Sequence, residues 1–325
     1  MGDTGETMKA VRFHGKGDLR YEQIPVPAVG KDQTIMGRYL WNSGIVESVG
    51  EDVTKYKKGD RVVIQPIIYD NTCGACQAGQ INCCYKGGFV GLSGLGGGLA
   101  DFIVLDQTFL YHLPDNIPLQ IGALIEPLAV AWHAVNMSGF EPGQSVLILG
   151  GGPIGLAVLQ TLLAKGATKI IVSEPSPARK SFALSFGATH VLDPTTTDIV
   201  STCLSLCENQ GVHIVFDAAG VQSGLDTAID AVRARGTIVN IAVWEKPCTI
   251  QPNKFVFKER RYMGIATYVG GDFEEVIAAI GSGRMKPGGM ITKRIRLEEV
   301  EKEGFEALIR DKAGQVKILV EVGGG

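Results

Sequence analysis

The chain has 325 residues, which at roughly 150 residues per domain fits two domains and excludes a small disulfide-stabilised scaffold. Its 31 lysines and arginines stand against 34 aspartates and glutamates, a formal charge of −3. Because this balance provides no overall basic field, we expect no nucleic acid and no membrane as a partner, but a small molecule. The 43 glycines exceed the roughly 23 expected from about 7% usage, which favours an enzyme with many turns and phosphate-binding loops.

The N-terminal segment has no apolar stretch flanked by basic residues, so we expect a cytoplasmic protein with neither a signal peptide nor a membrane anchor. Four of the seven cysteines are close together in the sequence: Cys73, Cys76, Cys83 and Cys84. In a cytosolic chain such a group favours a metal site or free thiols over disulfides.

The first part of the chain, up to about residue 115, indicates an all-β domain with short strands separated by Gly, Pro and Asp. The β-forming runs occupy residues 9–13, 44–49, 61–68 and 100–104. From about residue 118 the pattern changes. A long apolar segment over 119–138 predicts a helix with one kink at Pro127.

Strands and helices alternate beyond this helix. Apolar, β-branched runs predict strands over 145–149, 169–173, 214–218 and 237–242, each followed by a helical pattern. This order is typical of a doubly wound parallel sheet, so the predicted fold class is α/β. The last stretch predicts helices over 273–281 and 297–312 and a strand over 316–322. That strand can rejoin the first domain and make it discontinuous.

A glycine motif directly follows the first of these parallel strands. Gly150, Gly152 and Gly155 form G-x-G-x-x-G, with Pro153 and Ile154 between the last two, and the motif opens an apolar helix. The first glycine permits a tight turn, the second lets a pyrophosphate approach the backbone, and the third lets the helix pack closely on the sheet. The sequence therefore predicts a dinucleotide site. The alternative is an ordinary strand-to-helix turn.

Glu174 ends the next predicted strand, at the distance of about 20 residues where an acidic side chain binds the adenosine ribose of NAD. A carboxylate there repels the 2′-phosphate of NADP, so NAD is the predicted cofactor. Arg179 leaves an alternative open, because it can neutralise such a phosphate if it turns inward. A solvated arginine on a helix face is the interpretation that we favour.

Several segments together resemble the medium-chain dehydrogenase/reductase superfamily, and within it the zinc-dependent sorbitol and (R,R)-butanediol dehydrogenase branch. They lie at residues 9–13, 43–50, 58–62, 88–92, 96–100, 123–133 and 240–244. The resemblance implies a GroES-like β-barrel catalytic domain over 1–125, an NAD-binding Rossmann domain over 126–267 and a return to the catalytic domain over 268–325. It also implies hydride transfer between NAD and a secondary alcohol or vicinal diol, in a homo-oligomer that is a dimer or tetramer.

The resemblance also implies that a block of the catalytic domain is missing, so that the barrel is incomplete. In the family pattern a zinc-binding cysteine, a G-H-E motif and a proton-relay hydroxyl precede the strand that here begins at Ser43. Only residues 35–42 stand in their place. Glu126 matches the one remaining zinc ligand and catalytic candidate. Because a catalytic zinc needs about three protein ligands, one carboxylate cannot hold it tightly. His133 is either a substitute ligand or a buried histidine.

Cys73 and Cys76 resemble the start of the structural zinc lobe of the family. The last two cysteines of that lobe are replaced here by Gly79 and Gly87, and Cys84 is the third candidate ligand. Cys83 can be a fourth only if two adjacent side chains turn towards one ion. The alternatives are a structural zinc ion or reduced thiols in a folded loop.

The resemblance adds further cofactor contacts. It implies that the backbone of Ile241, Ala242 and Val243 and the segment around Ile265 border the nicotinamide, and that Lys317 reaches the pyrophosphate. Trp132 and Trp244 either line the substrate pocket or belong to the core. Three hypotheses follow: an NAD-dependent alcohol or diol dehydrogenase with a rebuilt metal site, a zinc-independent NAD(P)H reductase, and a non-enzyme. The last is either a protein that binds nucleotide without turnover or a chain shortened by splicing or by a mispredicted exon.

Overall fold

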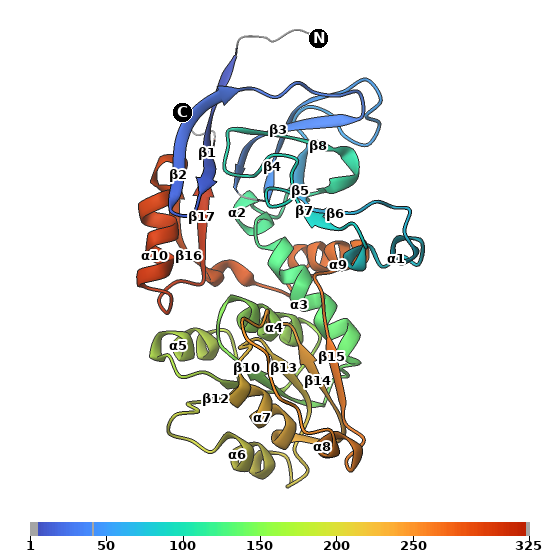
Figure 1. The fold of residues 1–325 in the computed structure, drawn as a ribbon, viewed down its shortest axis with the longest axis vertical. Coiled ribbons are helices and arrows are strands. Elements are labelled where there is room, and N and C mark those ends of the chain that lie inside the picture. Colours follow the sequence, from blue (N-terminus) through green and yellow to red (C-terminus); the bar gives the residue numbers. More distant parts are fainter. Residues whose placement is uncertain (1–5, 41, 323–325) are drawn as a thin grey trace. The chain divides into compact units, whose positions relative to one another are not determined.

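The computed structural model describes residues 6–40 and 42–322. The chain divides into two compact units (Figure 1). Unit 1 comprises Met1–Glu126, Val269–Gly281 and Ile291–Gly325, and unit 2 comprises Pro127–Tyr268 and Ser282–Met290. No helix in the described part of the chain is long and apolar enough to cross a bilayer.

Unit 1 is built mainly of short strands. They are β1 (Thr7–Gly15), β2 (Asp18–Pro25), β3 (Gln33–Leu40), β4 (Ser43–Val49), β5 (Arg61–Ile64), β6 (Ile67–Ile68), β7 (Gly88–Phe89), β8 (Phe102–Asp106), β9 (Leu110–His112), β16 (Ile291–Arg296) and β17 (Lys317–Glu321). Its helical segments include α1 (Gly74–Gln77), α2 (Leu119–Gly122), α9 (Gly270–Gly281) and α10 (Ala307–Arg310), with short 3-10 turns at Ile81–Cys83 (η1), Gln107–Phe109 (η2) and Leu297–Glu299 (η4).

A seven-stranded sheet organises unit 1, in the order β16-β17-β3-β4-β5-β9 with β8 paired to β3. The C-terminal strand β17 meets β3 antiparallel, with Glu321 opposite Leu40. Inward-facing residues such as Met36, Val46 and Val62 form its apolar core. The last strands of the chain therefore complete a sheet that the first strands begin.

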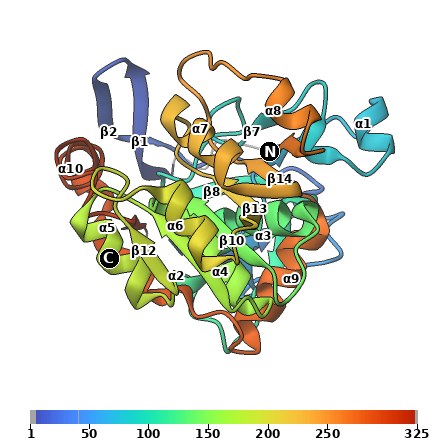
Figure 2. The same ribbon diagram turned by 90° about the horizontal axis from the view of Figure 1, so that it is seen from below.

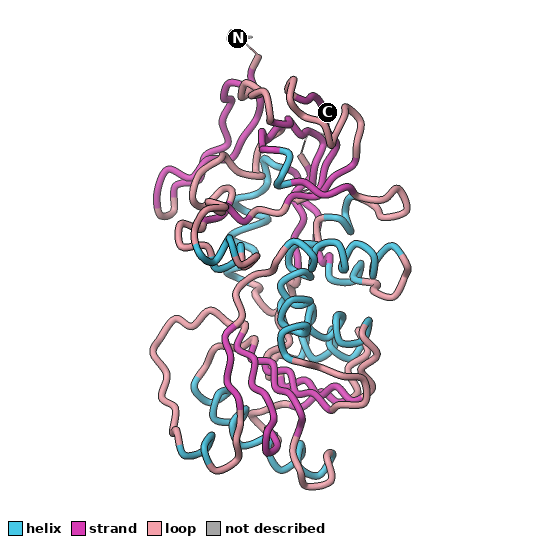
Figure 3. The backbone as a smooth tube through the Cα atoms, turned by 90° about the vertical axis from the view of Figure 1, so that its right-hand side faces the viewer, coloured by secondary structure: helices cyan, strands magenta, loops and turns pink. Residues whose placement is uncertain are grey.

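Unit 2 contains a six-stranded parallel sheet. Its strands are β10 (Ser145–Leu149), β11 (Lys169–Ser173), β12 (His190–Leu192), β13 (Val212–Asp217), β14 (Val232–Asn240) and β15 (Arg261–Gly264). Figure 3 shows these strands side by side. The strand order is β12-β11-β10-β13-β14-β15. Starting at β10, the chain adds β11 and β12 on one side of the sheet; it then returns to β13 and adds β14 and β15 on the other side. The reversal between β10 and β13 is a topological switch point, where doubly wound sheets bind their ligands.

Helices cover both faces of this sheet. They are α3 (Ile125–Ser138), whose first residues belong to unit 1, α4 (Pro153–Ala164), α5 (Pro177–Ser185), α6 (Ile199–Leu206), α7 (Gln222–Ala231), α8 (Asn253–Val256) and the 3-10 turn η3 (Pro287–Met290). Helix α4 contacts α5, and α6 contacts α7. Figure 2 shows the helices of unit 2 from below. Because crossovers between parallel strands are right-handed, the two pairs lie on opposite faces. The predicted α/β class, with a doubly wound parallel sheet, is confirmed.

Three predicted elements differ from the structure. The strand predicted over 61–68 is interrupted at Gln65, whose side-chain oxygen accepts a 2.8 Å hydrogen bond from the backbone N–H of Ile67. The helix predicted over 119–138 is two helices, so Pro127 stands in the first turn of α3, where a missing N–H costs nothing. The helix predicted over 297–312 is a 3-10 turn, a π-helical segment (η5, Val300–Glu306) and α10.

Candidate functional site

The glycine loop lies between β10 and α4, at the carboxyl end of the central strand. Gly150 has a positive φ of 95°, and a Cβ on Gly155 would lie 1.9 Å from the carbonyl oxygen of Gly150. Gly152 is the N-cap of α4 and Pro153 begins the helix. Because the first turn of a helix directs N–H groups outward and carries a partial positive charge, this end of α4 suits a phosphate group.

Glu174 lies directly beneath this loop. Its side chain is only 3% exposed. One carboxylate oxygen accepts a 2.7 Å hydrogen bond from the backbone N–H of Gly151, and the other accepts one of 2.8 Å from Ser176. The loop and the end of β11 are thus joined through one carboxylate, which connects the two sequence features predicted for a dinucleotide site.

Arg179, in the first turn of α5, is half-buried, with its guanidinium turned towards the same loop. Its Nη1 lies 3.7 Å from the position that a Cβ on Gly152 would occupy. Ser176 caps α5 by accepting a hydrogen bond from the backbone N–H of Arg179. This side of the loop therefore carries a cation as well as a helix N-terminus.

The predicted nicotinamide segments follow neighbouring parallel strands. Ile241 and Ala242 come directly after β14, and their N–H groups donate to the carbonyl oxygen of Asp217. Val243 is next in the chain, and its side chain is 93% exposed. Ile265 follows β15 and donates its N–H to the carbonyl oxygen of Asn240. All four residues therefore lie at the carboxyl edge of the sheet.

The two tryptophans belong to the core of unit 2. Trp132 is buried, and the ammonium of Lys165 lies 4.1 Å from the centre of its ring. Trp244 packs against the apolar cluster on one face of the sheet and donates a 3.0 Å hydrogen bond from Nε1 to Asn240. Both environments fit the core alternative for these side chains.

Glu126 and Lys317 both belong to unit 1, on α3 and at the start of β17. Burial lowers the pKa of Lys317, and the negative charge of Glu126 acts in the opposite direction. Within residues 6–40 and 42–322, neither Glu126 nor the buried His133 joins a group of three or more side chains able to hold a metal. The residues present therefore do not fit a catalytic zinc ion.

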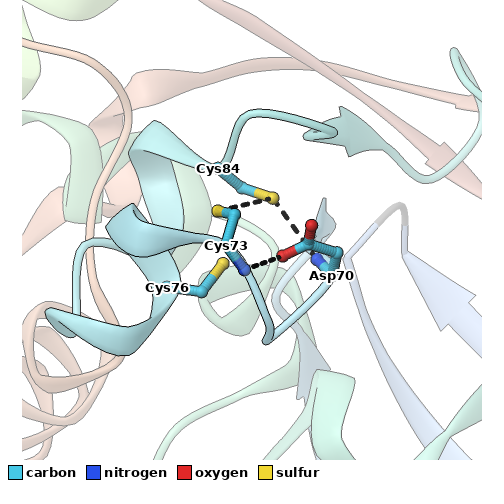
Figure 4. Close-up of side chains that lie close together, drawn as sticks. All are labelled: Asp70, Cys73, Cys76 and Cys84. Atoms are coloured by element: carbon cyan, nitrogen blue, oxygen red, sulfur yellow. Dashed lines mark hydrogen bonds between the residues drawn. The ribbon is translucent and has the colours of Figure 1, made fainter.

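One metal-ligand group does exist in the described part of the chain, and Figure 4 shows it in the loop around α1. It consists of Asp70, Cys73, Cys76 and Cys84, whose ligand atoms all lie within 4.8 Å of one another. The Sγ atoms of Cys73 and Cys84 are 3.9 Å apart. Two thiolates bound tetrahedrally to zinc at about 2.3 Å lie about 3.8 Å apart, so the geometry fits a structural zinc ion.

Asp70 is the member of this group that sequence reasoning missed. It precedes Cys73 by the same spacing that separates Cys73 from Cys76, which was the only signal available. Its Oδ1 accepts 3.0 Å hydrogen bonds from the N–H groups of Thr72 and Cys73. Cys83, the fourth ligand considered from sequence, is exposed and lies outside the group.

The ligand group is prepared for a cation by its surroundings. Backbone N–H groups of Tyr85 and Cys76 lower the pKa of Cys73, and those of Cys73 and Thr72 hold the pKa of Asp70 well below its usual range. Burial raises the pKa of Cys76 to about 12. These hydrogen bonds favour the anionic forms of Asp70 and Cys73, whereas burial disfavours the thiolate of Cys76 unless a bound cation offsets it.

Comparison with known proteins gives the family of the chain. Residues 14–115 match the alcohol dehydrogenase GroES-like domain, and residues 153–282 match the zinc-binding dehydrogenase model. The (R,R)-butanediol dehydrogenase of Bacillus subtilis (strain 168) is 40% identical over 350 residues, covering 96% of this chain and 99% of that protein. The chain belongs to the zinc-binding dehydrogenase family. It is a member of the zinc-dependent alcohol and diol dehydrogenases.

Solved structures agree with this assignment. The dehydrogenase is similar to 2R,3R-butanediol dehydrogenase from Bacillus subtilis, with a TM-score of 0.91 and 34% identity over 97% of this chain and all of that one. An Escherichia coli oxidoreductase/dehydrogenase of unknown specificity gives a TM-score of 0.93 at 26% identity, over 98% of this chain and all of that one. The GroES-like domain and the Rossmann-type sheet implied by the sequence resemblance are therefore confirmed.

The comparison also bears on the block that the sequence indicates is missing. The aligned stretch of 350 positions is longer than the 325 residues of this dehydrogenase, so the relative carries residues that have no counterpart here. In the structure β3 and β4 pair directly as neighbours, with Leu40 opposite Ser43. The junction of these strands leaves no room in the sequence for a catalytic loop.

Proposed function

We propose that this dehydrogenase binds NAD on unit 2 and transfers hydride between NAD and a secondary alcohol or vicinal diol of the 2,3-butanediol type. Unit 1 is the catalytic domain in this proposal. The observation that carries the proposal is the buried Glu174 carboxylate, which accepts the Gly151 N–H at 2.7 Å beneath a glycine loop that tolerates no side chain at Gly155.

Cofactor choice follows from the same carboxylate. Glu174 can accept hydrogen bonds from both hydroxyls of an adenosine ribose, and its charge repels a 2′-phosphate. The phosphates would lie at the N-terminus of α4, where Gly152 offers open backbone. The favoured cofactor is therefore NAD, although Arg179 provides one nearby positive charge.

Replacing Glu174 by glutamine tests this choice. The amide keeps an acceptor for the loop but loses the negative charge. NADH affinity should therefore fall about tenfold, and the ratio of NADH affinity to NADPH affinity should become smaller. Fluorescence titration with both nucleotides measures this. Asp198→Asn, at another carboxylate of unit 2 that accepts a main-chain N–H, is the control and should change neither affinity. An unchanged NADH to NADPH ratio in Glu174→Gln refutes the assigned role.

A structural zinc ion and a catalytic zinc ion are treated separately in this proposal. At the Asp70, Cys73, Cys76 and Cys84 group, zinc would hold the loop folded, since the three sulfurs and one carboxylate complete a tetrahedral set. No step is derived through a catalytic zinc, because the described residues do not provide its ligands. What this chain supplies to hydride transfer is the binding and orientation of the nicotinamide.

Turnover measurements separate the candidate functions. We expect NAD reduction with 2,3-butanediol, or NADH oxidation with acetoin, and a rate that survives EDTA treatment as long as the structural zinc is retained. A rate that EDTA abolishes at unchanged structural zinc content points to a rebuilt metal site. NADH binding without turnover of butanediol, sorbitol or acetoin would refute hydride transfer and identify a nucleotide-binding protein instead. Absence of NADH binding would refute the proposed cofactor site as well.

A further inference from the structure

Asp217 connects two loops at the carboxyl edge of the parallel sheet. It is the last residue of β13, and its side chain is fully buried. Its Oδ1 accepts hydrogen bonds from the N–H groups of Ala219 (2.9 Å) and Gly220 (3.0 Å). Its carbonyl oxygen accepts those of Ile241 (2.9 Å) and Ala242 (3.1 Å). One residue thus receives N–H groups from the loop after β13 and from the loop after β14.

The two loops are also in direct contact. Gly220 has a positive φ of 64°, and a Cβ there would lie 3.0 Å from the Cβ of Ala242 and 3.4 Å from the carbonyl oxygen of Val243. Asn240 supports the second loop from its other side, with Nδ2 donating to the carbonyl oxygen of Ala242 at 3.3 Å. The backbone of 241–243 is therefore held from both sides.

The position of these loops in the fold indicates which half of a dinucleotide they would contact. They lie on the β13 to β15 side of the topological switch point, whereas the glycine loop and Glu174 lie on the β10 to β12 side. Each half of a doubly wound sheet receives one mononucleotide of a dinucleotide. If the glycine half takes the adenosine end, the Asp217 half takes the nicotinamide end. The exposed Val243 side chain offers an apolar surface to such a ring.

The other carboxyl oxygen of Asp217, Oδ2, is buried and has no hydrogen-bond partner among the described residues. Burial raises the pKa of Asp217. Burial also raises the pKa of the nearby Tyr262 on β15, and the charge of Asp217 acts in the same direction. Buried polar atoms without partners are rare in folded proteins and require an explanation.

We propose that Asp217 is a positioning residue for the nicotinamide half of the cofactor site, because it holds the loops 218–220 and 241–243 against each other. This inference rests on the proposed function, in which unit 2 binds NAD. It assigns a role to Asp217 that is distinct from that of Glu174, since the two carboxylates serve opposite halves of one dinucleotide.

Two ligands distinguish these halves experimentally. NADH contains both mononucleotides, whereas ADP-ribose contains the adenosine half and the pyrophosphate but no nicotinamide. Asp217→Ala removes the acceptor for Ala219 and Gly220, so we expect about a tenfold loss of NADH affinity and less than a twofold change for ADP-ribose. Asp217→Asn keeps an oxygen acceptor and should restore most of the NADH affinity. Asp198→Ala, at an exposed helix cap of unit 2, is the matched control.

Gly220→Ala provides a second test that leaves Asp217 in place, because its Cβ would press on Ala242 from the other loop. It should weaken NADH and leave ADP-ribose binding unchanged, even if Asp217→Ala does not fold. Equal losses for both ligands, or no loss for either, overturn the positioning role. So does an Asp217→Asn variant as weak as Asp217→Ala. Failure of the proposed function looks different, since the unmodified protein would then bind neither NADH nor ADP-ribose.

Discussion

Alanine in place of Gly152 should remove most NADH binding and leave the fold intact. In the structure a Cβ at this position meets nothing closer than the Arg179 guanidinium at 3.7 Å, and the φ of −74° suits any residue. The added methyl group therefore has room until a pyrophosphate approaches the backbone. We expect NADH affinity to fall at least about tenfold, roughly 1.4 kcal/mol, with a melting temperature that does not change.

Gly155→Ala should instead damage both the fold and binding. Its Cβ would lie 1.9 Å from the carbonyl oxygen of Gly150, which is backbone and cannot turn aside. Overpacking of this kind costs about 3 kcal/mol or more, which lowers the melting temperature by roughly 6 to 12 °C. The two glycines of one motif thus have separable roles, one in packing and one in ligand approach.

Calorimetric melting and NADH titration of the same samples measure both effects. Gly271→Ala, at an open position in unit 1, is a matched control that should change neither quantity. If Gly152→Ala binds NADH normally while it remains folded, the pyrophosphate does not lie against this loop and the proposed cofactor site is wrong.

Cys73→Ser should release the structural metal. We expect about one zinc ion per chain in the unmodified protein and close to none in the variant, because a serine hydroxyl is a poor replacement for a thiolate ligand. Cys73 is also the N-cap of α1, a position that serine favours, so the substitution should not harm the helix itself. A lower melting temperature in the variant then reports the loss of the metal.

Two controls define which side chains hold the ion. Cys83→Ser alters the exposed neighbour of Cys84 and should leave zinc content unchanged. Glu126→Gln should also leave it unchanged, since Glu126 joins no ligand group in the described residues. Metal analysis by mass spectrometry measures each sample. A zinc content near two per chain, reduced to one by Glu126→Gln, would show that a catalytic site exists after all.

The glycine loop could be predicted from the sequence because the residues that define it are close together in the chain. Gly150, Gly152 and Gly155 are separated by fixed spacings along one turn, and Glu174 directly follows the next strand. The helix break before Pro127 could not be predicted from the sequence in this way. At this break the chain packs closely on distant segments, since a Cβ on Gly122 would lie 2.8 Å from a methyl group of Leu113 and 3.0 Å from the Cβ of Ser43.

Asp70 and Asp217 show why other site residues escaped prediction. An aspartate that accepts the N–H two or three residues onward is a common turn residue, and each of these does so. What distinguishes Asp70 is the return of the chain that brings Cys84 beside Cys73. What distinguishes Asp217 is the pairing of β13 with β14, which brings residues 241 and 242 to its carbonyl oxygen.

By itself, the sequence determined the α/β class and predicted the glycine loop with its acidic partner and three of the four residues of the candidate metal-ligand group, because spacing and periodicity are local properties of the chain. Only the tertiary structure decided that Asp70 joins the three cysteines, that Glu126 and His133 join no such group among the described residues, and that Asp217 holds two loops together. These outcomes depend on which distant segments lie side by side, and strand pairing and chain reversal settle that.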